Sequence, residues 1–415
     1  MTVLTFTGLF LLLLAATLLM RLWLARRQVR HVQTHRARVP AAFKGRISLP
    51  AHRKAADYTV AQTRFGMLST IIETLLLLGW TLGGGLEWVD QFWRAAGLGE
   101  LITGAAFLIS VFVIMGLIDL PITLYQTFII EARFGFNRSS LSLFITDNLK
   151  QALLLLVLGA PLALAALWLM QRSGTLWWFH LWLLWTGFTL IMLWAYPSVI
   201  APLFNKFVPL KDRALLARVR RLLKRAGFES RGVFVMDGSR RSAHGNAYFT
   251  GFGRNKRIVF FDTLLKSLHG PEIEAVLAHE LGHFHHRHIV KRLFMMFALS
   301  LASLALLGWL SQQLWFYQDL GMPVASNHAA LILFLMASPV FGFFLQPVMA
   351  WGSRRHEYQA DAFAAAQADA RAMIRALAKL YKENARTLTP DPLYSAFYDS
   401  HPPASLRIAH LQSLA

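Results

Sequence analysis

Long apolar stretches alternate with polar segments along the chain, and seven of them reach the roughly 20 residues that an α-helix needs to cross a bilayer. The second stretch contains Glu73 and the third contains Asp119. No basic residue precedes the first stretch and arginines follow it, so we expect a retained helix rather than a cleaved signal peptide. The pattern predicts seven transmembrane helices at about Met1–Met20, Phe65–Leu86, Leu101–Gln126, Gln151–Met170, Trp177–Ala195, Phe294–Trp315 and His328–Trp351.

Basic residues occupy alternate connections between these predicted helices. Residues 26–64 contain ten Lys and Arg but one acid, whereas the next connection contains only Arg94 and the one after the fourth helix only Arg172. The positive-inside rule therefore places the N-terminus outside and the basic connections in the cytoplasm. We predict four parts: 1–195 with five membrane helices and a basic cytoplasmic loop at 26–64, a cytoplasmic α+β segment at 196–293, two membrane helices at 294–351, and a cytoplasmic helical segment at 352–415.

The segment 196–293 has the pattern of a small α+β region. Three short β-rich runs are predicted to be strands at 232–236, 247–250 and 257–261, and residues 251–255 are expected to form the turn between the last two. Residues 211–227 have the spacing of an amphipathic helix with a basic face, which we interpret as a solvated or headgroup-facing helix rather than a recognition helix. A further helix begins near Pro271 and continues toward the sixth membrane helix. The predicted fold class is a mainly α, polytopic membrane protein with a small α+β region on its cytoplasmic side.

Composition narrows the partners and the chemistry. With 55% hydrophobic and 15% charged residues, a disordered chain is excluded. The absence of cysteine excludes disulfides, thiolate metal sites and cysteine nucleophiles. The net charge of +20 raises the question of a nucleic-acid partner, but orientation in the membrane accounts for most of it. We therefore expect a lipid bilayer and no nucleic acid as a partner.

The predicted helix after Pro271 contains the sequence His279-Glu280-Leu281-Gly282-His283. Residues four apart project from the same helix face, so the two imidazoles can reach one zinc ion. Glu280 is placed to take a proton from a zinc-bound water. Because such a pattern also arises by chance, a polar helix face that lines a loop is the alternative interpretation.

A carboxylate completes a catalytic zinc site of this type, and candidates follow the seventh membrane helix. Glu357 and Asp361 are four residues apart and share a face of a predicted helix. Glu357 could bind the metal while Asp361 accepts the free ring N–H of a ligating histidine. The alternative is that both acids pair with Arg354 and Arg355 at the surface.

These residues, together with several other blocks, resemble the type I CAAX prenyl endopeptidases, a family of gluzincin metalloproteases in the membrane. The blocks occur in the expected order over about residues 65–410. They are His279–His283, Ser353–Asp361, Phe134–Arg138 with Asp147 and Lys150, Tyr196–Leu210, Asn246–Phe249, and His401–Pro403 with Arg407.

The resemblance implies seven membrane helices and one Zn²⁺ per chain, bound by His279, His283 and Glu357. It implies that Glu280 is the general base and that Asp361 supports a zinc ligand. Asn246 and Ala247 resemble the edge strand that binds the substrate backbone, a mode with its own physical basis. His401 and Arg407 resemble the groups that stabilise the substrate and the developing oxyanion. His288 is assigned a structural role, and His285 and His286 are expected at the surface.

The leading hypothesis is a zinc-dependent membrane endopeptidase that acts on a peptide or protein substrate at the cytoplasmic face. By resemblance it removes the C-terminal tripeptide of prenylated CAAX substrates, in the bacterial inner membrane or the endoplasmic reticulum. A quality-control protease without prenylated substrates is the alternative. From other classes, we consider a transporter or channel that uses Glu73 and Asp119, and a catalytically silent scaffold.

Overall fold

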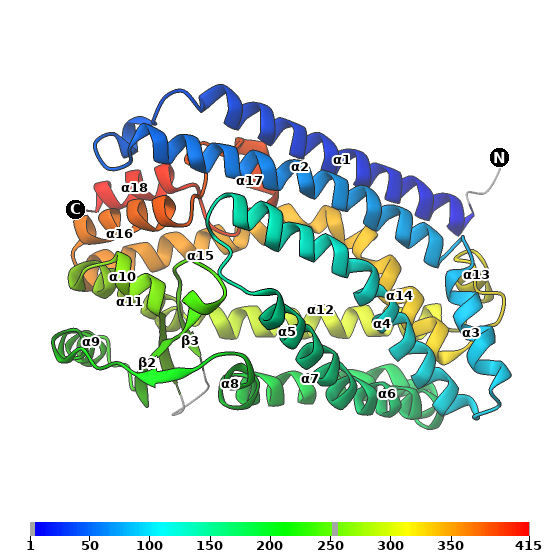
Figure 1. Cartoon of the computed structure of the whole chain (residues 1–415). Coiled ribbons are helices and arrows are strands. Elements are labelled where there is room, and N and C mark those ends of the chain that lie inside the picture. The colour runs from blue at the N-terminus through cyan, green and yellow to red at the C-terminus, as the bar shows by residue number, and fades with distance from the viewer. Residues whose placement is uncertain (1–4, 251–255, 415) are drawn as a thin grey trace.

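The computed structural model describes residues 5–250 and 256–414 and is mostly helical (Figure 1). The predicted turn at 251–255 lies outside the described residues. In Figure 1 a small sheet and several short helices gather at one end of the molecule, around the C-terminal helix, and the long helices extend from there to the opposite end, where the first helix begins. The mainly α fold class with a small α+β region is confirmed.

Long apolar helices make up the membrane part. Within the described residues, six helices or continuous helical segments are long and apolar enough to cross a membrane, and a seventh crossing results if the pair bent by 46° at residues 81–84 is one span. Each predicted apolar stretch overlaps one of these spans. The helices are α1 (Phe6–His35), α2 (Leu49–Trp80), α3 (Gly85–Ala95), α4 (Glu100–Tyr125), α5 (Leu141–Leu154), α6 (Ala160–Arg172), α7 (Trp177–Ala195), α12 (His288–Leu310), α14 (Asn327–Gly342) and α15 (Gln346–Gln367).

Several of these helices are longer than a bilayer requires. The 30 residues of α1 extend about 45 Å, whereas the hydrocarbon core of a bilayer is about 30 Å thick. The basic segment 26–64, expected as a loop, is therefore largely helical: α1 continues to His35 and α2 begins at Leu49. Both helices remain ordered because they pack along each other through small apolar side chains and through an ion pair of 2.6 Å between Arg36 and Asp57.

Four strands form the small sheet in the order β1-β2-β4-β3. The three predicted strands are confirmed as β2 (Gly232–Met236), β3 (Ala247–Thr250) and β4 (Arg257–Phe261). A short strand that we did not predict, β1 (Phe207–Pro209), pairs antiparallel with β2. β2 and β4 are parallel, and β3 pairs antiparallel with β4, which leaves the other side of β3 as an edge.

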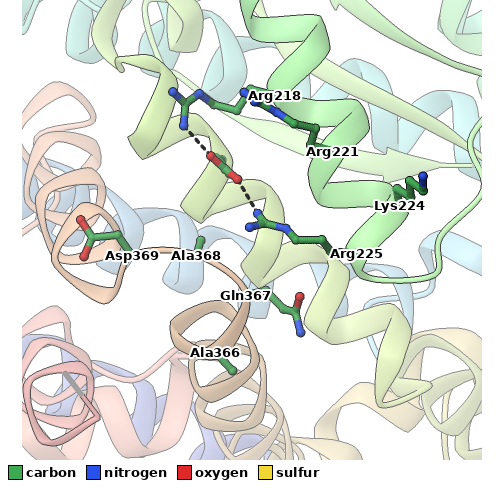
Figure 2. Close-up of a pocket in the computed structure, with 9 residues that line it drawn as sticks. Arg218, Arg221, Lys224, Arg225, Ala366, Gln367, Ala368 and Asp369 are labelled. Atoms are coloured by element: carbon green, nitrogen blue, oxygen red, sulfur yellow. Dashed lines mark hydrogen bonds and ion pairs between the residues drawn. The ribbon is translucent and has the colours of Figure 1, made fainter.

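This sheet shares one hydrophobic core with helices α9 (Arg213–Arg225), α10 (Asp262–Ser267), α11 (Gly270–His285), α16 (Ala370–Glu383) and α18 (Ala404–Ser413), and α17 (Pro392–Tyr398) precedes α18. The predicted basic helix is α9, and it buries Leu215, Val219 and Leu222. Its arginines are not all free in solvent. Arg218 and Arg225 both donate to Glu274 of α11, each at 2.7 Å, and Figure 2 marks these hydrogen bonds of the two arginines with dashed lines. Part of the basic face of α9 thus attaches the helix to α11.

The predicted continuous helix from Pro271 into the membrane is wrong. α11 ends at His285, and α12 begins at His288 after Arg287 adopts a left-handed conformation with φ of 55°. The hydrophobic pattern did not show the break because polar and apolar residues continue at helical spacing on both sides of it. The break changes the direction of the chain directly after the histidine motif.

Candidate active site

Two packed helices bring three metal-binding side chains together. His279 and His283 are one turn apart on α11, and Glu357 comes from α15. The Nε2 atoms of the two histidines lie 3.4 Å and 3.3 Å from the two oxygens of Glu357, and one atom from each residue lies within 4.8 Å of the others. The helices can approach this closely because Gly282 faces Ala360: a Cβ atom on Gly282 would lie 2.8 Å from the Cα of Ala360.

The two imidazoles and the carboxylate suit a metal cation. Glu357 is buried, and its Oε2 atom lies 3.4 Å from Nε2 of His279 and 3.4 Å from the guanidinium of Arg407, with no well-formed hydrogen bond to either. Burial and Arg407 lower the pKa of His279, but the neighbouring carboxylates of Asp361 and Glu357 more than compensate and bring this pKa to about 9. These carboxylates therefore favour positive charge beside the ring of His279. Two imidazoles and one carboxylate are also the protein ligands of a common class of catalytic zinc site, which leaves one position for water.

Asp361 lies directly behind the first histidine. Its Oδ1 atom is 2.9 Å from Nδ1 of His279, and its two oxygens accept hydrogen bonds from Arg407 at 2.8 Å and 2.5 Å. The alternative in which Glu357 and Asp361 pair with neighbouring arginines at the surface is wrong, because both acids are buried. Arg354 instead donates to the backbone carbonyl groups at the end of α17, and Arg355 lies over the ring of Trp351.

Glu280 faces a cavity of about 550 Å³ beside these ligands. Burial raises the pKa of Glu280 above its usual 4.5 and Glu357 acts in the same direction, while the two neighbouring histidines oppose them. His401 lines the same cavity, with its Nε2 atom 3.3 Å from Glu357. Arg407 is buried, and its guanidinium lies 3.4 Å from Glu357 in addition to its bonds with Asp361. A base, an imidazole and a guanidinium thus surround the three candidate ligands.

The edge strand opens onto this cavity. Asn246 and Ala247 line it. The carbonyl of Asn246 accepts a hydrogen bond from Phe261 in β4, so Ala247, the next residue, directs its own N–H and C=O away from the sheet. The N–H of Ala247 donates to the side chain of Asn246 at 2.9 Å. An extended peptide could therefore pair with this edge.

Residues that we did not single out from the sequence hold the edge strand. Asn384, at the end of α16, accepts a hydrogen bond from the N–H of Gly245 at 2.9 Å and donates to its carbonyl at 3.2 Å. Tyr58 donates to Glu131 at 2.5 Å, and His244 lies 3.4 Å from the same carboxylate. These partners come from distant parts of the chain, so no local motif indicates them.

The other blocks of the sequence resemblance support the same region from the membrane side. Arg241, which precedes the edge strand, forms two hydrogen bonds with Asp147 at 2.7 Å and 2.9 Å. Asn137 accepts a hydrogen bond from the N–H of Ser139, which orders the turn of its own block. Lys150 donates to the carbonyl of Leu203 at 2.6 Å. These blocks therefore connect the membrane helices to the strands.

The remaining polar residues noted in the sequence lie outside the site. Glu73 is 3.6 Å from Arg21, and Asp119 accepts a hydrogen bond from Thr123 one turn away. His285 is exposed and His286 is partly buried against Phe363. His288 is buried, and its Nδ1 atom lies 3.0 Å from Nδ1 of His283, the second histidine of the motif.

Comparison with known proteins agrees with this geometry. The family described as CAAX prenyl protease N-terminal, five membrane helices, matches residues 28–206, and Peptidase family M48 matches residues 209–415. The chain is 34% identical to CAAX prenyl protease 1 homolog of Arabidopsis thaliana, over 89% of each chain. It is also 34% identical to CAAX prenyl protease 1 of Saccharomyces cerevisiae, over 85% of this chain and 75% of the yeast protein.

A solved structure has the same fold. The crystal structure of S. mikatae Ste24p superimposes with a TM-score of 0.90 at 30% sequence identity, and the match covers 98% of both chains. Family membership implies a peptide or protein substrate, and the membrane helices imply a multi-pass protein. The chain belongs to peptidase family M48 and is an integral membrane metalloendopeptidase.

Proposed function

We propose that the chain binds one Zn²⁺ through His279, His283 and Glu357 and cleaves the C-terminal tripeptide from prenylated CAAX substrates at the cytoplasmic face of its membrane. The observation that carries the metal site is the convergence of these three side chains, which bring one ligand atom each to within 4.8 Å of the others beside the buried carboxylate of Glu357. The names of the relatives, CAAX prenyl protease 1 and its homologs at 34% identity, support the substrate class.

The residues around the ligands have separate roles in this proposal. When bound, zinc supplies a Lewis acid that lowers the pKa of a bound water toward neutrality. Glu280 accepts the proton from the attacking water and passes it to the leaving amine. Burial raises the pKa of Glu280, which favours a group that takes a proton and then returns it. Arg407 holds Asp361, and Asp361 fixes the ring of His279.

The substrate is oriented by strand addition. The free edge of β3 offers the backbone groups of Ala247, while Asn384 prevents the start of the strand from moving. His401 faces the same cavity without a fixed charge partner other than Glu357, so it is placed to donate to the oxyanion that forms during attack. These placements support the roles of His401, Asn246 and Ala247 in binding and stabilisation.

The distribution of basic residues supports the proposed orientation of the chain in the membrane. The sheet and the metal site lie at the end of the molecule that carries the basic segment 26–64, and the connections at the opposite end contain few basic residues. The positive-inside rule supports a cytoplasmic active site, and no nucleic-acid partner is needed to account for the charge. The compartment is a bacterial inner membrane or the endoplasmic reticulum.

The test is cleavage of a farnesylated CAAX peptide by the purified protein, with products identified by mass. The wild type should release the C-terminal tripeptide, and Glu280→Gln should bind zinc but release none. The same peptide without the farnesyl group is the matched substrate control. Equal cleavage of both peptides would exclude a requirement for prenylation and favour a quality-control protease, and cleavage by Glu280→Gln at the wild-type rate would exclude Glu280 as the base.

A further inference from the structure

We propose that His288 and Gln359 form a hydrogen-bond relay that selects the metal-binding tautomer of His283. This inference rests on the metal site of the proposed function and assigns positioning roles to two residues that do not touch the metal. The relay runs from the amide of Gln359 on α15, through both ring nitrogens of His288 at the start of α12, to the ring of His283 on α11. Three helices thus meet in one chain of hydrogen bonds.

The distances define the relay. Nε2 of His288 is 2.8 Å from Oε1 of Gln359, and Nδ1 of His288 is 3.0 Å from Nδ1 of His283. The opposite nitrogen of His283, Nε2, points to the candidate metal position and lies 3.3 Å from Glu357. His288 is only 1% exposed, so water cannot replace either partner of its ring.

The chemistry of the groups fixes the direction of each hydrogen bond. An amide oxygen can only accept, so Nε2 of His288 carries the hydrogen. In a neutral imidazole the other nitrogen is then an acceptor, and Nδ1 of His288 accepts from the Nδ1–H of His283. His283 therefore keeps its hydrogen on Nδ1 and leaves the lone pair of Nε2 free for a metal ion.

The reverse arrangement would prevent metal binding. If the amide of Gln359 presented its NH₂ group, Nε2 of His288 would accept and its Nδ1–H would donate to His283. His283 would then carry its hydrogen on Nε2, and no lone pair would face the metal position. The oxygen of Gln359 at the far end of the relay thus determines which ring nitrogen of His283 carries the hydrogen.

The two histidine ligands are supported in different ways. His279 donates to Asp361, a carboxylate that can only accept, so its tautomer is selected directly. Among the residues that the structure describes, no carboxylate contacts Nδ1 of His283, the ring nitrogen opposite the candidate metal position, and this nitrogen contacts instead a second imidazole whose own state depends on Gln359. The relay performs for His283 what Asp361 performs for His279.

The backbone is arranged to build this contact. In a continuous helix, residues five apart point about 140° away from each other, so His288 would not face His283. The left-handed conformation of Arg287, with φ of 55°, ends α11 and returns His288 beneath the motif. A residue other than glycine rarely adopts this conformation, and such strained positions cluster at functional sites. His356 stacks on His288 with ring centroids 4.0 Å apart and holds the plane of the ring.

The experiment compares two substitutions of Gln359 that differ in their acceptor atoms. Gln359→Met has similar length but replaces the amide oxygen with a thioether sulfur, which is only a weak acceptor, whereas Gln359→Glu offers only acceptor oxygens. The zinc dissociation constant of purified full-length protein is measured by competition with a chelator, and thermal unfolding of the metal-free protein is measured in parallel. Gln367→Met, a change of the same kind near the end of the same helix, is the matched control.

We expect Gln359→Met to weaken zinc binding by about 10- to 100-fold, the usual effect of losing a group that orients a ligand, and Gln359→Glu to bind zinc within about threefold of wild type. His288→Phe, which keeps the stack on His356 but removes both nitrogens, should weaken zinc binding like Gln359→Met. The control should match the wild type. A role in packing alone predicts that Gln359→Met and Gln359→Glu change the unfolding of the metal-free protein but leave the zinc constant unchanged.

The outcomes separate this inference from the proposed function. If the wild type binds one zinc and Gln359→Met binds it with unchanged affinity, the relay is overturned while the metal site stands. Equal loss of affinity in Gln359→Met and Gln359→Glu would also overturn it, because the acceptor would not matter. If the wild type binds no zinc, the proposed function fails, and the relay fails with it.

Discussion

Substitution of Gly282 by alanine tests whether the contact between α11 and α15 sets the geometry of the metal site. The added Cβ atom would lie 2.8 Å from the Cα and 3.1 Å from the carbonyl oxygen of Ala360, and 3.2 Å from the Cβ of Phe363. These are atoms of the backbone or attached directly to it, so a rotamer change cannot relieve the clash. The helices must separate by about half an ångström before the closest pair reaches ordinary contact.

The expected effect has two parts. Forcing an extra carbon atom into a packed contact costs typically about 1–3 kcal/mol of stability. The same displacement moves Glu357 on α15 away from His279 and His283 on α11, and metal–ligand distances tolerate changes of only about 0.2 Å. We therefore expect Gly282→Ala to lower thermal stability moderately and to weaken zinc binding by at least about tenfold, the lower limit for disturbing the surroundings of a ligand.

The assay is chelator competition for zinc together with thermal unfolding of the metal-free protein. Gly352→Ala, also on α15, is the matched control because a Cβ atom there has nothing within 4 Å. The control should behave like the wild type in both measurements. If Gly282→Ala retained the zinc affinity and unfolding temperature of the wild type, the close approach of the two helices would not be what positions the ligands.

Three further predictions concern groups around the site. Asn384→Ala removes both hydrogen bonds to Gly245, the residue before Asn246. KM for a peptide substrate should therefore rise while the zinc dissociation constant stays unchanged. Weaker zinc binding would contradict a role confined to the edge strand. Arg407→Met removes the guanidinium that donates two hydrogen bonds to the buried Asp361 and should cost about 3–5 kcal/mol of stability in thermal unfolding, whereas a cost below about 1 kcal/mol would show that His279 alone is a sufficient partner for Asp361. Burial raises the pKa of Glu272, but hydrogen bonds from a backbone N–H and from Lys379 lower it, and the net pKa lies below the usual 4.5. Glu272 therefore stabilises the fold above pH 4.5, and this stabilisation is lost as the pH falls through the folded-state pKa. The stability difference between wild type and Glu272→Gln should therefore be largest near neutral pH and shrink in acid, and a difference independent of pH would refute the assignment.

Local sequence patterns predicted much of this architecture. Stretches of about 20 apolar residues predict membrane helices because each spanning helix must satisfy its own backbone hydrogen bonds within the bilayer. The strands β2, β3 and β4 were predicted with the bounds that the structure has, since short β-rich runs between turn residues carry their own signal. The pairing of His279 with His283 likewise depends only on the helical repeat.

Contacts between distant segments could not be predicted from local sequence patterns. The strand β1 has three residues and no alternation that would distinguish it from a loop. The end of α11 depends on one residue, Arg287, whose left-handed conformation has no sequence signature comparable to that of glycine. The helical continuation of the basic segment 26–64 depends on the packing of α1 against α2, which the charge pattern along either helix alone does not reveal.

The sequence by itself therefore determined the apolar membrane helices, the strands β2, β3 and β4 and the two histidines of the motif, because each depends on interactions within a few residues or on transfer into the bilayer. Only the tertiary structure decided that Glu357 lies against His279 and His283, and that Asp361 faces His279 rather than a surface arginine, since that follows from the close crossing of α11 and α15 at Gly282. It also decided that His288 contacts both His283 and Gln359, a residue 71 positions farther along the chain. Hydrogen bonds over such separations are selected by packing and burial, which no local pattern in the sequence records.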